Sequence, residues 1–103
     1  MTTSGRPLKD ILPNVIHSPI RLSILGVLNQ VDQIYFSDLK GLIGVSDAEL
    51  SRQLRVLEQD HIVAISKRRE NRKSVTVVSL TEDGRSRFED YLSELNTIVN
   101  GRL

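Results

Sequence analysis

Two helix signals lie on either side of Gly44, and their spacing leaves few folds open to this chain. Ser37 is expected to cap a short helix over Asp38–Ile43, which Gly44 ends because glycine tolerates the left-handed backbone of a helix C-terminus. Residues 46–49, Ser-Asp-Ala-Glu, form a capping-box pattern that predicts a second helix from Asp47 to about Gln59. Two helices joined by a short turn that contains glycine make a helix-turn-helix. The apolar side chains of the first helix that should face inward are Leu39, Leu42 and Ile43.

Further helices are expected before and after this motif. Ser18-Pro19 combines a hydroxyl cap with proline at the first helical position, which predicts a helix over Pro19–Asn29. An apolar stripe of helical period runs from Leu8 to Ile16, but Pro13 lies within it and predicts a short or kinked helix. Thr81 is expected to cap the last helix, because acidic residues follow it in the first turn.

Strand patterns occupy the rest of the chain. Ile34–Phe36 is long enough for one small strand, while Ile62–Lys67 and Ser74–Leu80 are rich in β-branched residues and predict a hairpin. The polar segment 68–73 is expected to be its exposed basic tip, with Asn71 at a turn position of positive φ. The predicted fold class is therefore α+β: mainly α with a small β-hairpin, in a winged helix-turn-helix arrangement.

Length and composition are those of one globular domain. The chain has 103 residues, of which 39% are hydrophobic and 26% charged, and this agrees with a single domain over residues 1–103. We expect an N-terminal arm at 1–18, a winged-helix core at 19–80 and a terminal helix at 81–103. The lack of cysteine excludes disulfides and thiolate metal sites. No apolar run is long enough for a membrane span, so we expect a cytoplasmic protein with no membrane partner.

Charge is distributed unevenly although the net charge is only +1. The segment from Arg52 to Lys73 contains seven basic residues and three acidic ones. A basic segment indicates a partner of opposite charge. Local excesses of this size also arise by chance, so the places of these residues in the fold decide between the two interpretations.

The helix over residues 47–59 has two chemically different faces at 100° per residue. Leu50, Leu54 and Leu57 lie on one side and are expected to enter the core. The opposite side, here called the reading face, consists of Ala48, Ser51, Arg52, Arg55 and Gln59. Arginine can donate two hydrogen bonds to guanine, glutamine can pair with adenine, and alanine lets the backbone approach the bases. Any solvated helix face is polar, but its place as the second helix of a helix-turn-helix before a basic hairpin favours DNA.

The hairpin tip carries the highest density of positive charge. Its basic residues are Lys67, Arg68, Arg69, Arg72 and Lys73. Such a loop can simply keep the protein soluble or protect a sheet edge. Bunched cations repel one another, however, and a phosphate backbone relieves that repulsion with release of counterions. The tip is therefore predicted to contact the DNA backbone or the minor groove.

Three motifs, in this order along the chain, resemble the winged-helix regulators of the MarR type. They are Ser51–Glu58 in the second helix of the motif, Ile62-Val63 at the strand entry, and Leu80–Arg85 at the start of the last helix. The similarity covers about Pro19 to Leu95. The chain departs from the family pattern at Asp60-His61, where the family usually has glycine, although histidine tolerates left-handed φ better than most residues.

The resemblance implies a sequence-specific transcriptional regulator that binds double-stranded DNA as a homodimer, on a near-palindromic operator. Carried over by position, the groove-reading residues are Ser51, Arg52 and Arg55, and Ser37 is expected to meet a phosphate. The wing residues implied by the family pattern are Arg68, Arg69, Arg72 and Lys73.

The apolar stripe of the last helix has two candidate covers, the Leu8–Ile16 segment of the same chain and the same helix of a second chain. We predict a two-fold dimer built from the two terminal segments. The residues of this predicted dimer stripe are Leu8, Ile11, Leu12, Phe88, Tyr91, Leu92, Leu95, Ile98 and Val99. A small-molecule effector, if the protein senses one, is expected between the winged-helix core and the terminal helices, since no dedicated ligand domain fits in this length.

Other functions are less well supported by the sequence. His17 and His61 have no acidic or nucleophilic neighbours at motif spacing, so we expect no enzyme, no cofactor and no metal. A metal sensor of the ArsR type shares the fold but needs cysteine or clustered ligands. The main alternative is a winged helix that binds another protein instead of DNA.

Overall fold

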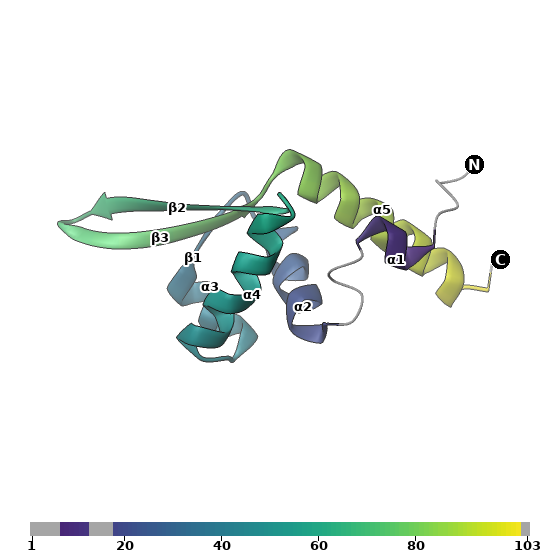
Figure 1. The fold of residues 1–103 in the computed structure, drawn as a ribbon, viewed down its shortest axis with the longest axis horizontal. Helices are drawn as coiled ribbons and strands as arrows, with labels where there is room; N and C mark the ends of the chain where they lie inside the picture. Colours follow the sequence, from purple (N-terminus) through teal and green to yellow (C-terminus); the bar gives the residue numbers. More distant parts are fainter. Residues whose placement is uncertain (1–6, 13–17, 102–103) are drawn as a thin grey trace.

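The computed structural model describes residues 7–12 and 18–101. The element order is α1 (Leu8–Ile11), α2 (Pro19–Leu28), β1 (Ile34–Tyr35), α3 (Phe36–Ile43), α4 (Asp47–Gln59), β2 (Val63–Glu70), β3 (Lys73–Leu80) and α5 (Glu82–Val99). The three strands form one antiparallel sheet in the order β1-β3-β2. Figure 1 shows the β2–β3 hairpin, here called the wing, and α5 extending in opposite directions from α2, α3 and α4. The predicted winged helix-turn-helix is confirmed.

The caps of α2 and α4 are those that the sequence predicts. The Ser18 hydroxyl accepts a hydrogen bond from the Arg21 N–H at 3.1 Å, with Pro19 in the first turn. The Ser46 hydroxyl accepts from the Glu49 N–H, also at 3.1 Å. The carboxylate of Glu49, expected to return to the backbone of Ser46, instead contacts the side chains of Arg52 and Gln53.

Two predictions for α3 are wrong. The helix begins at Phe36 with Tyr35 as its N-cap, so Ser37 lies inside the first turn and does not cap it. Strand β1 passes directly into α3 because Phe36 packs against the core instead of extending the strand. Leu42, expected inside, is 66% exposed, because Leu39 and Ile43, four residues apart, already form the inward stripe of this short helix. Gly44 ends the helix at φ 80°, as predicted.

The wing is longer than the sequence indicates. Its strands pair from Val63↔Leu80 to Glu70↔Lys73, so most of the polar segment expected as a loop is strand. The turn consists of Asn71 and Arg72 with φ of 50° and 67°, and two positive φ values favour the right-handed twist of a hairpin. Polar side chains can continue the ladder here because the outer part of the wing is solvated and needs no core.

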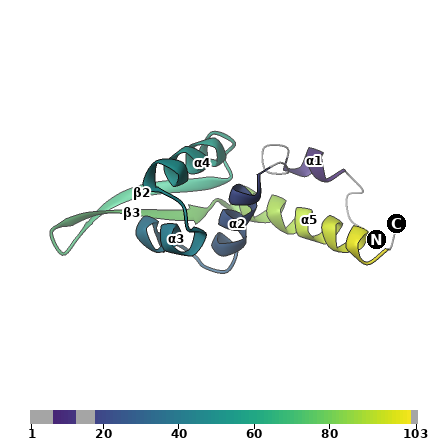
Figure 2. The ribbon, with the colours of Figure 1, turned by 90° about the horizontal axis from the view of Figure 1, so that it is seen from below.

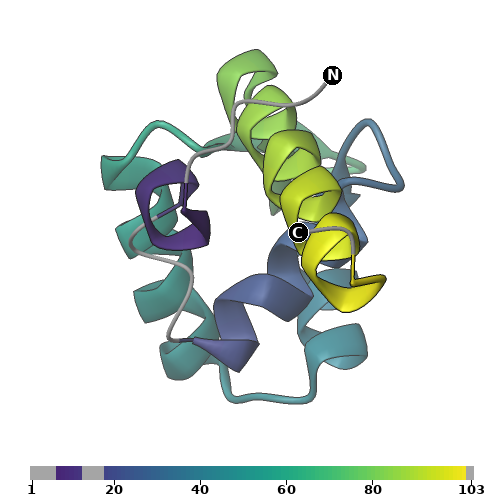
Figure 3. The ribbon, with the colours of Figure 1, turned by 90° about the vertical axis from the view of Figure 1, so that its right-hand side faces the viewer.

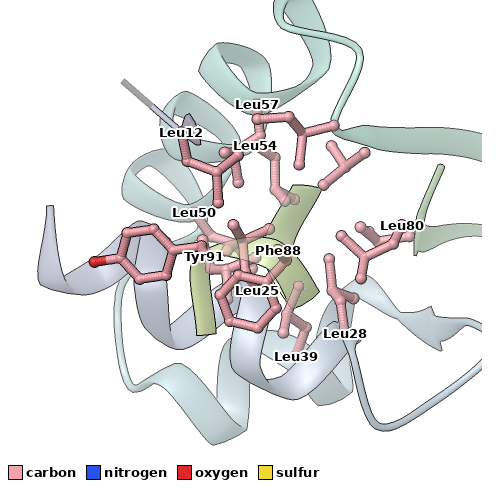
Figure 4. Packing of buried hydrophobic residues seen from close by; sticks show 14 of the residues in the cluster. Leu12, Leu25, Leu28, Leu39, Leu50, Leu54, Leu57, Leu80, Phe88 and Tyr91 are labelled. Atoms are coloured by element: carbon pink, nitrogen blue, oxygen red, sulfur yellow. The ribbon is translucent and has the colours of Figure 1, made fainter. Parts of the chain in front are cut away.

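The core lies where α2, α3 and α4 meet the base of the sheet and the first half of α5. Figure 4 shows its leucines converging on Phe88, whose ring lies 6.3 Å from that of Tyr91. The fully buried leucines are Leu12, Leu25, Leu28, Leu39, Leu50, Leu54 and Leu57. Within the described helices, none combines the length and the apolar character that crossing a membrane requires.

Part of the predicted dimer stripe is buried within one chain. Helix α1 packs beside α5, as Figures 2 and 3 show, and Arg87 donates to the carbonyl of Ile11 at 3.3 Å. Four members of the stripe, each at most 3% exposed, are therefore core residues and not free interface residues: Ile11, Leu12, Phe88 and Tyr91. Helix α1 ends at Ile11, while the predicted kink at Pro13, the rest of the segment to Ile16 and the Leu8 side chain lie outside the described residues.

Residues of the Leu80–Arg85 motif join α5 to the rest of the fold. The Thr81 hydroxyl accepts from the Gly84 N–H at 2.8 Å and donates to the carbonyl of His61 at 2.7 Å. A Cβ on Gly84 would lie 2.1 Å from the Ile62 carbonyl oxygen, so only glycine fits. Arg85 donates to the carbonyls of Asn29 and Val31, each at 3.0 Å. These contacts hold the first turn of α5 against the turn between α4 and β2 and against the connection between α2 and β1.

Candidate nucleic-acid interface

Helix α4 has the two faces that the sequence predicts. Leu50, Leu54 and Leu57 are at most 1% exposed. All five residues of the reading face are exposed: Ala48, Ser51, Arg52, Arg55 and Gln59. The capping of α4 by Ser46 and the burial of its leucines hold this face toward solvent.

A hollow of about 550 Å³ separates α4 from the wing, and we call it the α4–wing groove. It brings Ser51 and Arg55 of α4 together with Lys67 of the wing, three residues that the sequence analysis assigned separately to DNA contacts. Its complete lining is Phe36, Asp47, Ser51, Leu54, Arg55, Glu58, Ile65, Lys67 and Thr76. The sequence analysis missed Glu58 and Thr76, although Glu58 follows Arg55 at the i+3 spacing that places side chains on one helix ridge.

Side-chain alternation divides the basic residues of the wing between two faces. Lys67 pairs with Thr76 and lines the groove, and Arg69, two residues on, lies on the same face. Arg68 lies on the opposite face, where its guanidinium donates to the Gln33 side chain at 2.6 Å and lies 3.8 Å from the Glu70 carboxylate. The sequence analysis grouped all of these cations together, because it treated the segment as a loop without faces.

Glu70 anchors the outer face of the wing to β1. The Tyr35 hydroxyl donates to its carboxylate at 2.5 Å. This hydrogen bond, together with the negative charge of Glu70, raises the pKa of Tyr35. At the turn, Arg69 donates to the carbonyl of Arg72 at 3.1 Å. The Glu70 carboxylate therefore contacts both the Tyr35 hydroxyl from β1 and the guanidinium of Arg68 on the same strand.

Ser37 is exposed in the first turn of α3. Tyr35, the N-cap residue, makes no side-chain hydrogen bond to the helix end. The first backbone N–H groups of a helix have no intrahelical partner, so this end offers donors to an anion.

Within residues 7–12 and 18–101, no group of three or more histidine, cysteine or acidic side chains could hold a metal ion. His61 is an exposed turn residue with φ 60°, which agrees with the left-handed turn expected at the departure from the family pattern. His17 lies outside the described residues.

Sequence and structure comparisons place this arrangement among known proteins. A family described as "winged helix DNA-binding domain" matches residues 20–99. The chain is 34% identical over 77 residues to a Bacillus subtilis protein named uncharacterized HTH-type transcriptional regulator YdgJ. That match covers 75% of this chain but only 46% of the relative, so the chain spans less than half of the relative's length.

Solved structures share the fold, and two of them show how far the similarity extends. The structure of a transcriptional regulator homologue from Pyrococcus horikoshii superposes with a TM-score of 0.81 at 28% identity, over 91% of this chain and 94% of that one. NadR in complex with 4-hydroxyphenylacetate superposes with a TM-score of 0.71 at 20% identity, over 91% of this chain and 66% of that one. The second similarity, at its low identity, concerns the fold alone.

Proposed function

The chain belongs to the winged helix DNA-binding domain family, and from this membership we propose that it is a MarR-like transcriptional regulator that recognises a specific double-stranded DNA site as a homodimer. Residues 1–103 act as one unit in this proposal.

The observation that carries the proposal is the α4–wing groove, where a cation of α4 and a cation of the wing lie beside the carboxylates of Asp47 and Glu58, the first of which pairs with Lys40 at 3.0 Å. Arg55 lines it from the exposed face of α4, and Lys67 lines it from the wing. A single partner of negative charge can therefore contact both elements at once. Duplex DNA meets this requirement because it presents base edges in the major groove between two rows of phosphates.

In this proposal α4 enters the major groove. Arg52 and Arg55 donate to guanine, while Ser51 and Gln59 supply further hydrogen bonds and Ala48 permits close approach. Lys67 and Arg69 on the groove side of the wing contact phosphate or the minor groove, together with Arg72 at the turn and Lys73 beside it. Ser37 and the first N–H groups of α3 meet a phosphate of the same duplex.

The remaining apolar stripe of α5 supports a homodimer. Leu92, Ile98 and Val99 are 40%, 45% and 72% exposed, and the half-buried Leu95 lies between them. Pairing with the same stripe of a second copy about a two-fold axis covers these side chains. Such a dimer presents two copies of α4 to a near-palindromic site. We also propose that any small-molecule effector binds between the winged-helix core and the terminal helices.

The test is selection from a randomised duplex pool, followed by mobility-shift titration of the enriched sequence at two salt concentrations. We expect enrichment of one near-palindromic sequence, with binding that weakens as salt rises. A scrambled duplex of the same composition is the control. No retardation of any duplex at either salt concentration contradicts the proposal and favours the alternative, a winged helix that binds another protein.

A further inference from the structure

A chain of side-chain contacts runs from α2 to the reading face of α4. Arg21, on α2, donates from Nη1 to Oε1 of Gln53 at 2.7 Å. Gln53 in turn donates from Nε2 to the Glu49 carboxylate at 2.5 Å, and the other oxygen of that carboxylate pairs with Nη2 of Arg52. The contacts therefore connect the body of the domain with an arginine of the reading face.

Along this series of contacts, the exposed fraction of the side chains increases from α2 toward the reading face. Arg21 and Gln53 are half-buried, the Glu49 side chain is 23% exposed, and the Arg52 side chain is 66% exposed. The amide of Gln53 uses its oxygen toward Arg21 and its nitrogen toward Glu49, so its orientation is fixed at both ends. Glu49 is fixed in turn by the capped first turn of α4, where its own N–H donates to Ser46.

We propose that Gln53 and Glu49 are positioning residues that hold the Arg52 guanidinium in the orientation that reads a base. The inference rests on the proposed DNA binding. An unrestrained arginine on a helix surface samples many rotamers, and ordering it on binding costs free energy. The contact with Glu49 occupies Nη2 of a group that carries five N–H donors, so donors remain for guanine. Neither Gln53 nor Glu49 reads DNA itself.

Gln53→Glu tests the hydrogen bond from Gln53 to Glu49 without changing the size of the side chain. A glutamate at position 53 can still accept from Arg21, but it cannot donate to the Glu49 carboxylate and repels it. Gln30→Glu is the matched control, because it adds the same charge at an exposed position outside the reading face. Gln53→Ala removes both links, and thermal unfolding of each variant establishes that it folds.

The measurement is selection from a randomised duplex pool, followed by titration of the enriched site with each base substituted in turn. Arg52→Ala identifies the base pair that Arg52 reads as the position whose preference falls, by roughly 10- to 100-fold. We expect Gln53→Glu to lower the preference at that same base pair by about 3- to 10-fold. Preferences elsewhere, the salt dependence and the behaviour of Gln30→Glu should stay unchanged. In the Arg52→Ala background, Gln53→Glu should have no further effect.

Unchanged preference at the Arg52 base pair in both position-53 variants overturns the inference. An equal change in affinity for all sequences also overturns the inference. Such a result means that Glu49 affects binding only through its charge and does not orient Arg52. Failure of the wild-type chain to enrich any sequence is a different result, since it contradicts the proposed function itself.

Discussion

His61 carries a backbone φ of 60° at the junction between α4 and β2, where glycine would be unstrained. Its side chain is exposed, while its carbonyl accepts from Thr81 and its N–H donates to Glu58. The left-handed conformation costs roughly 1–2 kcal/mol in residues with a Cβ, and glycine removes this cost but loses more entropy on folding. We predict that His61→Gly raises the free energy of unfolding by about 0.5–1 kcal/mol, measured by urea denaturation. His61→Ala, which keeps the left-handed strain, is the control. If His61→Gly is less stable than His61→Ala, the prediction is contradicted.

Arg55 lies on the exposed side of α4 and contributes to no part of the core. Because it lines the α4–wing groove, we predict that Arg55→Ala weakens binding to the selected duplex by roughly 1–3 kcal/mol. The melting temperature should stay unchanged. The matched control is Arg87→Ala, which removes the hydrogen bonds to the carbonyls of Ile11 and Asp60 and should therefore lower stability. Normal binding by Arg55→Ala counts directly against its assignment to the reading face.

Single residues also show which structural details could be predicted from sequence. The caps Ser18, Ser46 and Thr81 were predictable because a hydroxyl satisfies N–H groups only two or three residues away. Ser37 was wrongly assigned as the N-cap of α3, because the start of this helix depends on Phe36, which packs against residues distant in sequence. Leu42 has the same apolar character as its neighbours, and only the packing of a short helix shows that it lies outside.

Among the elements, the wing allows a test of the division between its two faces. We predict that replacing Arg69 and Arg72 together by alanine weakens specific and non-specific duplexes alike, because phosphates are common to all sequences. The slope of log affinity against log salt should fall by about one unit for each phosphate that the wing no longer neutralises. Arg68→Ala is the control and should change this slope less, because Arg68 lies on the opposite face and contacts Gln33 and Glu70. An unchanged slope in the double variant contradicts the proposed binding of phosphate by the wing.

The wing also shows where prediction from sequence ends at the scale of elements. The β-branched runs located the inner parts of both strands, because burial on one face selects those residues. The outer parts, such as Lys67–Glu70, carry no apolar pattern, and their pairing follows from the ladder already formed and the Asn71-Arg72 turn. Without an apolar pattern, the sequence showed only that the cations of the wing lie in one segment, and not which face of the wing each one occupies. The α4–wing groove became evident only from the structure.

At the scale of the whole molecule, the exposed end of α5 decides the state of assembly. Leu92, Ile98 and Val99 of the stripe are exposed, while Leu95 between them is partly covered by the core of its own chain. Each large apolar side chain that leaves water contributes roughly 1.5–3 kcal/mol, so pairing of two stripes is strongly favourable. We predict a dimer of twice the 11.6 kDa chain mass by light scattering at micromolar concentration. The two α4 helices should then meet half-sites about 34 Å apart on the duplex.

Ile98→Glu tests this prediction better than a change at Leu95, because Ile98 is 45% exposed whereas Leu95 packs against the core of its own chain. A buried glutamate at the two-fold interface would face its symmetry mate, and the charge repulsion and desolvation should leave a folded monomer. Ser93→Glu is the control, since Ser93 is exposed on the opposite side of α5 from the stripe and should stay in the dimer. The monomer should bind a single half-site weakly and lose the advantage of a palindromic duplex, because the two half-sites are no longer bound by one linked molecule. A wild-type monomer that binds the palindrome tightly contradicts the dimer, and so does an Ile98→Glu dimer.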